Sequence, residues 1–247
     1  MSGEEGLLKS VWKMPATCAV CAANIAVFVL LRARHVPPED VGLSYRTVVG
    51  ERQLWRAVTA AFAHYSVLHL AFNVAAVFQL GALERGLGTL AYVRATVLLL
   101  LACPALALAL HGALLRCGRS NRDTVAVGYS GVAFGLMTIA AARAHGGTYA
   151  VLGLRVPALA TPFLSLALTQ VLVPQASFVG HAAGIAAGLA VARGAFAWFD
   201  TWALAEVLGW GAVALVWSLK VSSRIAVPWL VLEPDAPALS GIVVDSV

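Results

Sequence analysis

Charged side chains are scarce in this sequence. Asp, Glu, Lys and Arg make up 12% of the 247 residues, roughly half the share of a typical soluble domain. Apolar residues take their place and reach 60%. The formal net charge is +5, but the cations form no basic block, which argues against a nucleic-acid partner and favours contact with lipid headgroups. The composition therefore predicts a protein whose main solvent is a lipid bilayer.

Cysteine is scarce as well, with four residues in the chain. Cys18 and Cys21 form a CxxC pair, a spacing found in zinc and redox sites. The pair stands in an apolar run with no second ligand pair nearby, so we interpret both thiols as small buried side chains. His69 and His181 could bind a metal, but no third ligand has a suitable spacing. We therefore predict no metal and no organic cofactor.

Apolar runs long enough to cross a bilayer recur along the chain. Six spans are expected, at about residues 16–31, 67–83, 90–110, 125–142, 157–173 and 178–192. The longer, more polar connection over 36–66 is expected to form an interfacial or re-entrant element anchored by Trp55 and Arg56. The apolar stretch 202–219 contains Glu206 and several tryptophans, so it either forms a seventh span or lies in the interface.

The fold prediction is an all-α membrane protein, a bundle of six transmembrane helices with a long first loop and a possible extra C-terminal helix. Its parts are an N-terminal tail (1–14), a six-helix core (15–198) and a C-terminal segment with its tail (199–247). Lys and Arg are shared almost equally between the two sides of such a bundle. The positive-inside rule therefore does not set the orientation.

Polar residues inside the expected spans indicate a functional site, because such groups are costly in a bilayer. His69 and Asn73 are four residues apart and share one face of the second helix. Ser130 stands in the fourth, between glycines in the sequence Gly128-Tyr129-Ser130-Gly131. Each set alone also fits ordinary helix packing, through interhelical hydrogen bonds or small-residue contacts.

The third set lies in the sixth expected helix, where His181 shares a face with Gly184 and Gly188. Glycines at this spacing allow close approach of a neighbouring helix, and with the fourth helix as that neighbour His181 would reach Ser130. A serine needs a base to take its proton, and a neutral imidazole suits that role. No carboxylate lies in the spans near His181, so the expected arrangement is a Ser–His dyad.

Acyl transfer also needs donors directed at the developing oxyanion. The candidates are the side chains of His69 and Asn73 and the backbone N–H of Ser130. Phe134 lies one turn after Ser130 on the same face of the helix.

Four stretches resemble the rhomboid family of intramembrane serine proteases: WRAVTAAFAHYSVLHLAFN (55–73), LERGLG (83–88), GYSGVAFG (128–135) and GHAAGIAAG (180–188). Their order and spacing agree over about residues 15–198. The resemblance implies Ser130 as nucleophile, His181 as general base, and His69 and Asn73 as oxyanion donors. It places His64 nearby, makes Trp55 and Arg56 a structural pair of the first loop, and implies membrane-protein substrates with a single transmembrane segment.

Phe134 stands where many family members have a tyrosine that stacks on the histidine, and the phenyl ring is expected to stack in the same way. Within the family, the sequence is similar to the plant rhomboid-like branch, near the endoplasmic-reticulum rhomboids. This likeness implies a membrane of the endoplasmic reticulum or Golgi, a cytosolic N-terminus and a site open to the lumen. It sets no oligomeric state.

Two other functions are compatible with a polytopic chain. A catalytically silent rhomboid relative would bind membrane clients for trafficking or degradation, but such relatives typically lack the serine or the histidine. A transporter or channel is disfavoured because the core spans carry no acidic residues and the chain has no internal repeat.

Overall fold

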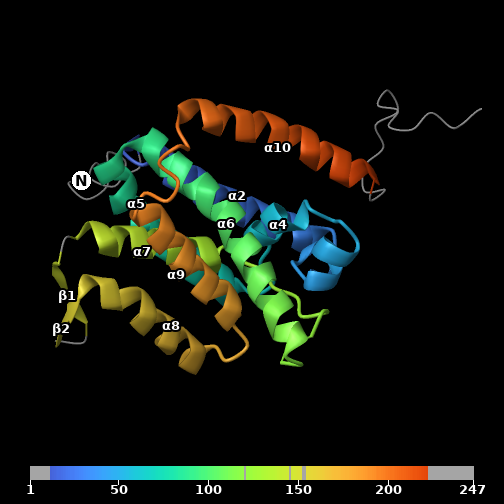
Figure 1. The fold of residues 1–247 in the computed structure, drawn as a ribbon, viewed down its shortest axis with the longest axis horizontal. Helices are drawn as coiled ribbons and strands as arrows, with labels where there is room; N and C mark the ends of the chain where they lie inside the picture. The colour runs from blue at the N-terminus through green and yellow to red at the C-terminus, as the bar shows by residue number, and fades with distance from the viewer. Residues whose placement is uncertain (1–11, 120, 145, 152–153, 222–247) are drawn as a thin grey trace, which may run out of the picture.

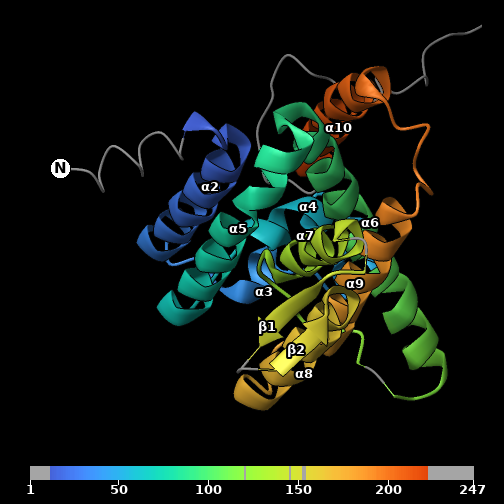
Figure 2. The same cartoon turned by 90° about the vertical axis from the view of Figure 1, so that its left-hand side faces the viewer.

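The computed structural model describes residues 12–119, 121–144, 146–151 and 154–221. Within them the long helices are α2 (Pro15–Ala33), α5 (Val67–Leu87), α6 (Thr89–Arg116), α7 (Ser130–Arg143), α8 (Thr161–Leu172), α9 (Phe178–Ala192) and α10 (Thr201–Val221). Figures 1 and 2 show a bundle with α10 lying outside it. The predicted helical membrane fold, six core helices and one extra, is confirmed.

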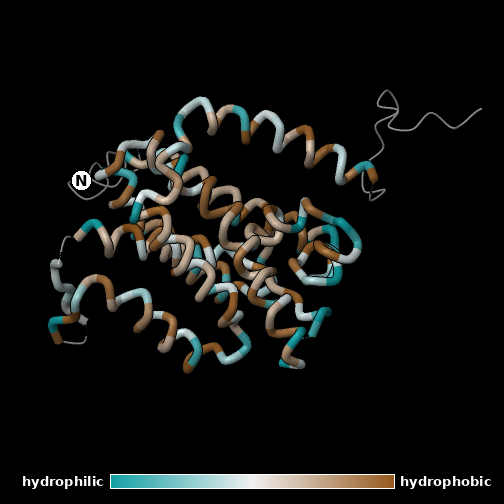
Figure 3. The backbone as a smooth tube through the Cα atoms, in the orientation of Figure 1, coloured by the Kyte–Doolittle hydropathy of each residue, from teal (hydrophilic) through white to brown (hydrophobic). Residues whose placement is uncertain are grey.

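Four of these helices, α2, α5, α6 and α10, are long and apolar enough to cross a membrane. The helices α7, α8 and α9 are apolar but shorter. Polar residues gather in the connecting segments, above all in the loop between α2 and α5 (Figure 3). The bundle is thus apolar along its length and polar mainly where the chain turns.

The apolar core lies among α5, α6, α7 and α9. Its fully buried members include Val77, Leu99 and Leu136, and the side chain of Tyr129 is enclosed with them. Figure 2 shows α7 and α9 side by side within the bundle, and these two helices pack along their whole length. The core therefore centres on the pair of helices that carries Ser130 and His181.

The loop between α2 and α5, for which an interfacial or re-entrant element was predicted, folds into short helical turns: α3 (Pro38–Val41), η1 (Arg46–Gly50), α4 (Arg56–Thr59) and η2 (Ala60–Phe62). The anchoring prediction for Trp55 and Arg56 is wrong in its detail. Both are buried by protein, at 6% and 3% exposure. Arg56 donates to the carbonyls of Glu39 and Gly42, at 2.6 and 2.9 Å. The pair holds the loop together because a buried guanidinium must find acceptors within the protein.

The fourth predicted span is corrected at its start, because α7 begins at Ser130 and not near Val125. The preceding residues are extended, and Ala126 forms an antiparallel bridge with Leu43, with N–O distances of 2.9 and 2.8 Å. Gly128 then adopts a φ of +109° and donates its N–H to the carbonyl of Ala60. Backbone pairing with the first loop replaces the helical hydrogen bonds that the apolar run suggested.

The second predicted span also ends later, at Leu87, because Glu84 is buried inside α5 and not exposed at its end. The carboxylate accepts from the backbone N–H groups of Ala16 and Thr17, at 3.0 and 2.8 Å, and from two threonine hydroxyls, Thr17 and Thr89. Glu84 thereby caps the N-terminus of α2, where a negative charge is favourable.

The short hairpin after α7 was not expected from the sequence. Strand β1 (Thr148–Val151) pairs with β2 (Leu154–Pro157), and η3 (Ala158–Ala160) leads from β2 into α8. The predicted fifth span at 157–173 therefore divides into a turn and the 12-residue helix α8. The sixth predicted span agrees with α9 at both ends.

Candidate active site

Ser130 occupies the first residue of α7, at the end of the helix that faces the first loop. A helix of 14 residues is roughly 21 Å long, whereas the hydrocarbon core of a bilayer is roughly 30 Å thick. The helix is therefore about 9 Å shorter than that core. The chain before α7 is bridged to the first loop, so no further helical turn precedes the serine.

His181 reaches Ser130 from α9, with Nε2 of the imidazole 2.8 Å from Oγ of the serine. Ser177, the N-cap of α9, accepts a hydrogen bond from the N–H of Gly180 at 3.0 Å. This cap fixes the start of α9 one turn before the histidine. The two side chains that the sequence placed on separate helices therefore meet in a direct hydrogen bond.

Glycines on both helices make this approach possible. A Cβ built on Gly184 would collide with the carbonyl of Gly131, and one on Gly188 would collide with the carbonyl of Gly135. On the other helix, a Cβ on Gly135 would come within 2.6 Å of Leu99. The backbones of α7 and α9 are therefore in direct contact, as expected for small residues at a helix–helix interface.

The ring of Phe134 lies against the imidazole of His181, with centroids 4.6 Å apart and planes inclined by 30°. Nδ1 of His181 is buried and has no hydrogen-bond partner among the described residues. No carboxylate holds the imidazole in the described part of the chain, so packing against Phe134 orients it. The geometry is that of a Ser–His pair with an aromatic support.

The backbone N–H groups of the first turn of α7 are candidate oxyanion donors. The first N–H groups of a helix have no partner within the helix, and Tyr129, the N-cap residue, contributes no side-chain bond to them. The positive end of the helix dipole also favours negative charge there. The Ser130 N–H therefore belongs to a donor set that the start of α7 creates.

His69 and Asn73, the other two predicted oxyanion donors, lie on α5. The ring of His69 lies against Gly128, where a Cβ would be 2.6 Å from Cε1 and 2.8 Å from Nε2. Asn73 is buried, and its Nδ2 donates to the carbonyl of His69 at 2.9 Å. The structure thus brings His69 to the segment that precedes the serine, whereas the Asn73 amide turns back onto its own helix and keeps one N–H free of that bond.

His64 is fully buried beside His69, with ring centroids 4.9 Å apart. Its Nδ1 lies 3.1 Å from the carbonyl of Phe62. The two rings, inclined by 59°, fill the space beside Gly128, whose missing side chain leaves room for them. His64 therefore supports the position of His69 and does not contact the serine.

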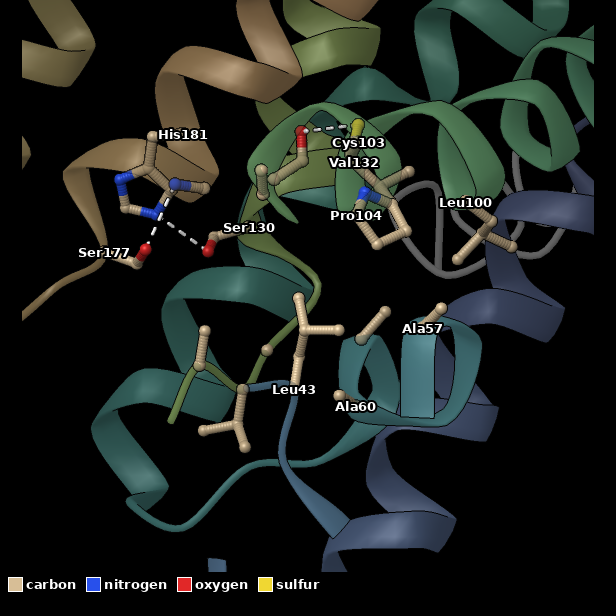
Figure 4. Close-up of a pocket in the computed structure, with 17 residues that line it drawn as sticks. Leu43, Ala57, Ala60, Leu100, Cys103, Pro104, Ser130, Val132, Ser177 and His181 are labelled. Carbon is tan, nitrogen blue, oxygen red and sulfur yellow. Dashed lines mark hydrogen bonds between the residues drawn. The ribbon is translucent and has the colours of Figure 1, made fainter. Parts of the chain in front are cut away.

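A cavity of about 70 Å³ opens beside the serine. Figure 4 shows Ser130, His181 and Ser177 at one end, and Leu100 and Ala57 at the other. The wall between them consists mainly of small or apolar residues, among them Ala60, Cys103 and Pro104. This volume holds a few water molecules or one small side chain next to the hydroxyl.

A family model for the rhomboid domain matches residues 51–198, more than half of the chain. This chain belongs to the rhomboid family. Rhomboid-like protein 14, mitochondrial, of Arabidopsis thaliana is 30% identical over 187 residues, 72% of this chain and 55% of that protein. Rhomboid-related protein 4 of Homo sapiens is 31% identical over 183 residues, 73% and 57% of the two chains.

A fungal relative, Rhomboid-type serine protease 2 of Debaryomyces hansenii, is 32% identical over 139 residues, 53% of this chain and 46% of its own. This rhomboid chain thus spans about half the length of the curated relatives it matches. The matched region contains Ser130, His181, His69 and Asn73, so the family resemblance inferred from the motifs is confirmed.

Three residues around the site of this rhomboid chain escaped the sequence analysis. Ser177 has a recognisable signal, a serine just before an apolar helix with its partner N–H three residues on. Cys103 lines the cavity, and its thiol donates to the carbonyl of Gly131 over 3.7 Å. Leu43 pairs with Ala126 from the far side of the cavity. The contacts of Cys103 and Leu43 join residues that are distant in the sequence, and no local pattern predicts them.

Proposed function

We propose that this rhomboid chain is an intramembrane serine endopeptidase that cleaves transmembrane segments of membrane proteins. The observation that carries the proposal is the 2.8 Å contact between Ser130 Oγ and His181 Nε2, made between the apolar helices α7 and α9. A serine beside an imidazole at the start of a helix, with free backbone donors, is the arrangement that acyl transfer needs.

In the proposed reaction, the Ser130 oxygen attacks the carbonyl carbon of the scissile peptide bond while its proton passes to Nε2 of His181. The oxyanion that forms accepts hydrogen bonds from the first N–H groups of α7 and from His69. The imidazolium gives its proton to the leaving amine, which completes the acyl-enzyme. Water then attacks the ester, with His181 as base, and releases the second product and the free serine.

The substrate is proposed to enter from the side, past α8. This helix buries only Pro162 and Leu166 among its 12 residues, and bulky residues such as Phe163 and Leu168 are more than half exposed. A helical peptide bond is hydrogen-bonded and shielded, so local unwinding must precede attack. Segments with helix-weakening residues near the membrane surface are therefore the favoured substrates.

The cavity favours a small side chain next to the scissile bond. Ala57, Ala60 and Pro104 leave room for a side chain of a few atoms beside Ser130, and no ionised group lines the cavity. A charged side chain would be desolvated there without a partner. Alanine or glycine before the cut is therefore expected to be preferred over leucine, phenylalanine or a charged residue.

Cleavage is measured with purified protein in vesicles that contain a model substrate with one transmembrane segment. The wild type is expected to cut, and Ser130→Ala and His181→Ala are each expected to lower kcat by about 10⁴-fold or more. Ser177→Gly is the matched control, because it removes a second hydroxyl from the same cavity and glycine weakens an N-cap by only a few tenths of a kcal/mol. It is expected to retain most of the activity.

Continued cleavage by Ser130→Ala would contradict the assignment of the nucleophile. A wild type that binds the substrate but leaves it intact in the same vesicles would instead indicate a catalytically silent, client-binding relative. The two outcomes are separated by recovering the substrate with the protein after cross-linking.

The proposal includes a membrane of the endoplasmic reticulum or Golgi, with the N-terminus in the cytosol and Ser130 on the lumenal side. The support is the likeness to the endoplasmic-reticulum rhomboids that the sequence suggests. One relative, Rhomboid-like protein 14 of Arabidopsis thaliana, is named mitochondrial and makes the mitochondrion the alternative location. A fluorescent fusion imaged with markers for the endoplasmic reticulum, Golgi and mitochondria tests the location. Mitochondrial signal alone would contradict it.

A further inference from the structure

The β1–β2 hairpin has one apolar face and one polar face. Tyr149 pairs with Val156, and two residues nearer the turn Val151 pairs with Leu154, so these two pairs share a face. The alternate pairs, Thr148 with Pro157 and Ala150 with Arg155, belong to the opposite face. Alternation of this kind is the signature of a strand pair with a different medium on each side.

The apolar face is not covered by the described part of the protein. Tyr149 is 46% exposed and Leu154 is 70% exposed. Within the described residues, the two strands pack on each other and on no helix to a comparable extent. A lone two-stranded hairpin is only marginally stable in water, so an uncovered apolar face calls for an apolar medium.

The place of the hairpin identifies that medium. It joins the C-terminal end of α7 to the start of α8, at the end of α7 farthest from Ser130 (Figures 1 and 2). The N–H of Ala158 donates to the carbonyl of Gly147 at 2.9 Å, which closes the hairpin at its base and ties it to η3. Leu159 and Phe163 follow at once, 49% and 52% exposed. Exposed apolar side chains therefore continue along the chain from the hairpin into α8.

We propose that the hairpin is a membrane-interface anchor, seated in the headgroup region of the bilayer on the side opposite Ser130. Its apolar face, with Tyr149 and Leu154, contacts the upper acyl chains, and the Arg155 face lies toward phosphate and water. Tyrosine is favoured at this depth, and arginine is attracted to anionic lipid there. The outer edges of both strands carry unpaired backbone groups, which exclude the hydrocarbon core.

The anchor would hold the start of α8 at a constant depth. The base of the hairpin is hydrogen-bonded to η3, and η3 runs without a linker into α8. The rest of the bundle buries only Pro162 and Leu166 of this helix. The bilayer would therefore supply, at one end of α8, a restraint that protein contacts do not.

Single-cysteine labelling tests the seating of each face. In a Cys117→Ser background, an environment-sensitive fluorophore is placed at Leu154→Cys and, as the matched control on the opposite face, at Arg155→Cys. The full chain is reconstituted in vesicles of phosphatidylcholine with a minority of phosphatidylglycerol. Quenching is measured with aqueous iodide and with lipids that carry a nitroxide near the headgroup end of the acyl chain. Unsubstituted background protein corrects for labelling of other cysteines.

The expected result is opposite behaviour at neighbouring positions. The label at 154 is quenched by the nitroxide lipid and reached by iodide several-fold less than the label at 155. Tyr149→Cys and Thr148→Cys repeat the comparison on the other strand, where 149 behaves like 154 and 148 like 155. This second pair decides the matter where a β2 variant fails to fold.

Equal access of iodide to both faces would overturn the proposal, because it would place the hairpin in water. Protection of 149 and 154 from both quenchers would also overturn it, because a second protein copy would then cover the face. Neither readout depends on proteolytic activity, so a failure of the anchor is distinct from a failure of the protease assignment.

Discussion

Helices α9 and α8 are neighbours in the chain and both are apolar, yet they are packed in opposite ways. Six residues of α9 are buried, including His181, Gly184 and Gly188, whereas α8 buries only Pro162 and Leu166. The difference follows from side-chain size. Glycines on α9 let its backbone touch α7, whereas most of the large side chains of α8, among them Phe163 and Leu168, face outward and are exposed.

Packing in a bilayer depends on close contact, because lipid tails are as apolar as leucine and no hydrophobic force drives helices together. Gly131, Gly135, Gly184 and Gly188 form a glycine seam between α7 and α9. This seam lets the two helices pack more closely than either packs against α8. We infer that the seam holds Ser130 and His181 in fixed geometry while α8 is free to move aside for a substrate. The predictions below test this contrast, from the largest expected effect to the smallest.

The largest effect is expected from one methyl group at the seam. A Cβ on Gly184 collides with the Gly131 carbonyl, one residue after Ser130, the proposed nucleophile. Gly184→Ala is therefore expected to cost about 1–3 kcal/mol of stability and, by displacing α9 from α7, to lower kcat by about 10²-fold. Thermal unfolding in detergent and initial cleavage rates in vesicles measure the two effects.

Gly209→Ala is the matched control, because the same methyl group on α10 meets open space. It is expected to leave cleavage and unfolding unchanged or to stabilise α10 slightly. Equal effects of the two substitutions would contradict the view that the seam, and not helix glycine in general, holds the site.

The aromatic support of the histidine is expected to have a smaller effect. Phe134→Ala removes the ring against which His181 stacks, so the imidazole samples other orientations. An aromatic pair is worth about 0.5–1.5 kcal/mol, which corresponds to a fall in kcat of up to about tenfold. Phe134→Tyr is expected to retain the rate, because it keeps the ring. Steady-state kinetics separate kcat from KM.

Phe163→Ala provides the comparison on α8, where the same ring is 52% exposed. It is expected to leave kcat unchanged. A loss of kcat as large as that of Phe134→Ala would mean that α8 orients the reacting groups, and the contrast between the two helices would fail.

The smallest effect on the cleavage rate is expected inside α8 itself, where the substitutions are read out as stability. Leu166 is 8% exposed and packs with Phe134 and Ile185, whereas Leu168 is 58% exposed. Leu166→Ala is expected to cost about 1–2 kcal/mol, at the lower end for a buried leucine because lipid fills part of the space. Leu168→Ala is expected to cost less than about 0.5 kcal/mol. Denaturant unfolding in mixed micelles gives both values.

The same contrast explains what the sequence could predict. The bounds of α9 and the meeting of Ser130 with His181 follow from patterns within single helices, namely glycine spacing and a polar residue on the same face. Helix α7 begins five residues later than the apolar run suggests, because Leu43 in the first loop takes the backbone hydrogen bonds of Ala126. A pairing between residues so far apart has no local signal.

Two further misses have similar causes. The charge of Glu84 predicted the end of a span at that position. The backbone N–H groups at the start of α2 instead bind the carboxylate, and Glu84 lies inside α5. The strands around Tyr149 and Leu154 are short, so the sequence predicted only a connection leading to the fifth helix and no hairpin. The partners of Glu84 lie far away in the sequence, outside the window that periodicity can examine, and each hairpin strand has only 4 residues, too few for a clear alternation.

The central claim is that His181 activates Ser130 within the bundle, and covalent labelling tests it most directly. The protein in vesicles is treated with a fluorophosphonate and analysed by intact-mass spectrometry and peptide mapping. The account predicts one adduct, on Ser130, formed by the wild type and lost in His181→Ala. Equal labelling of wild type and His181→Ala, or an adduct on Ser177 in place of Ser130, would contradict it.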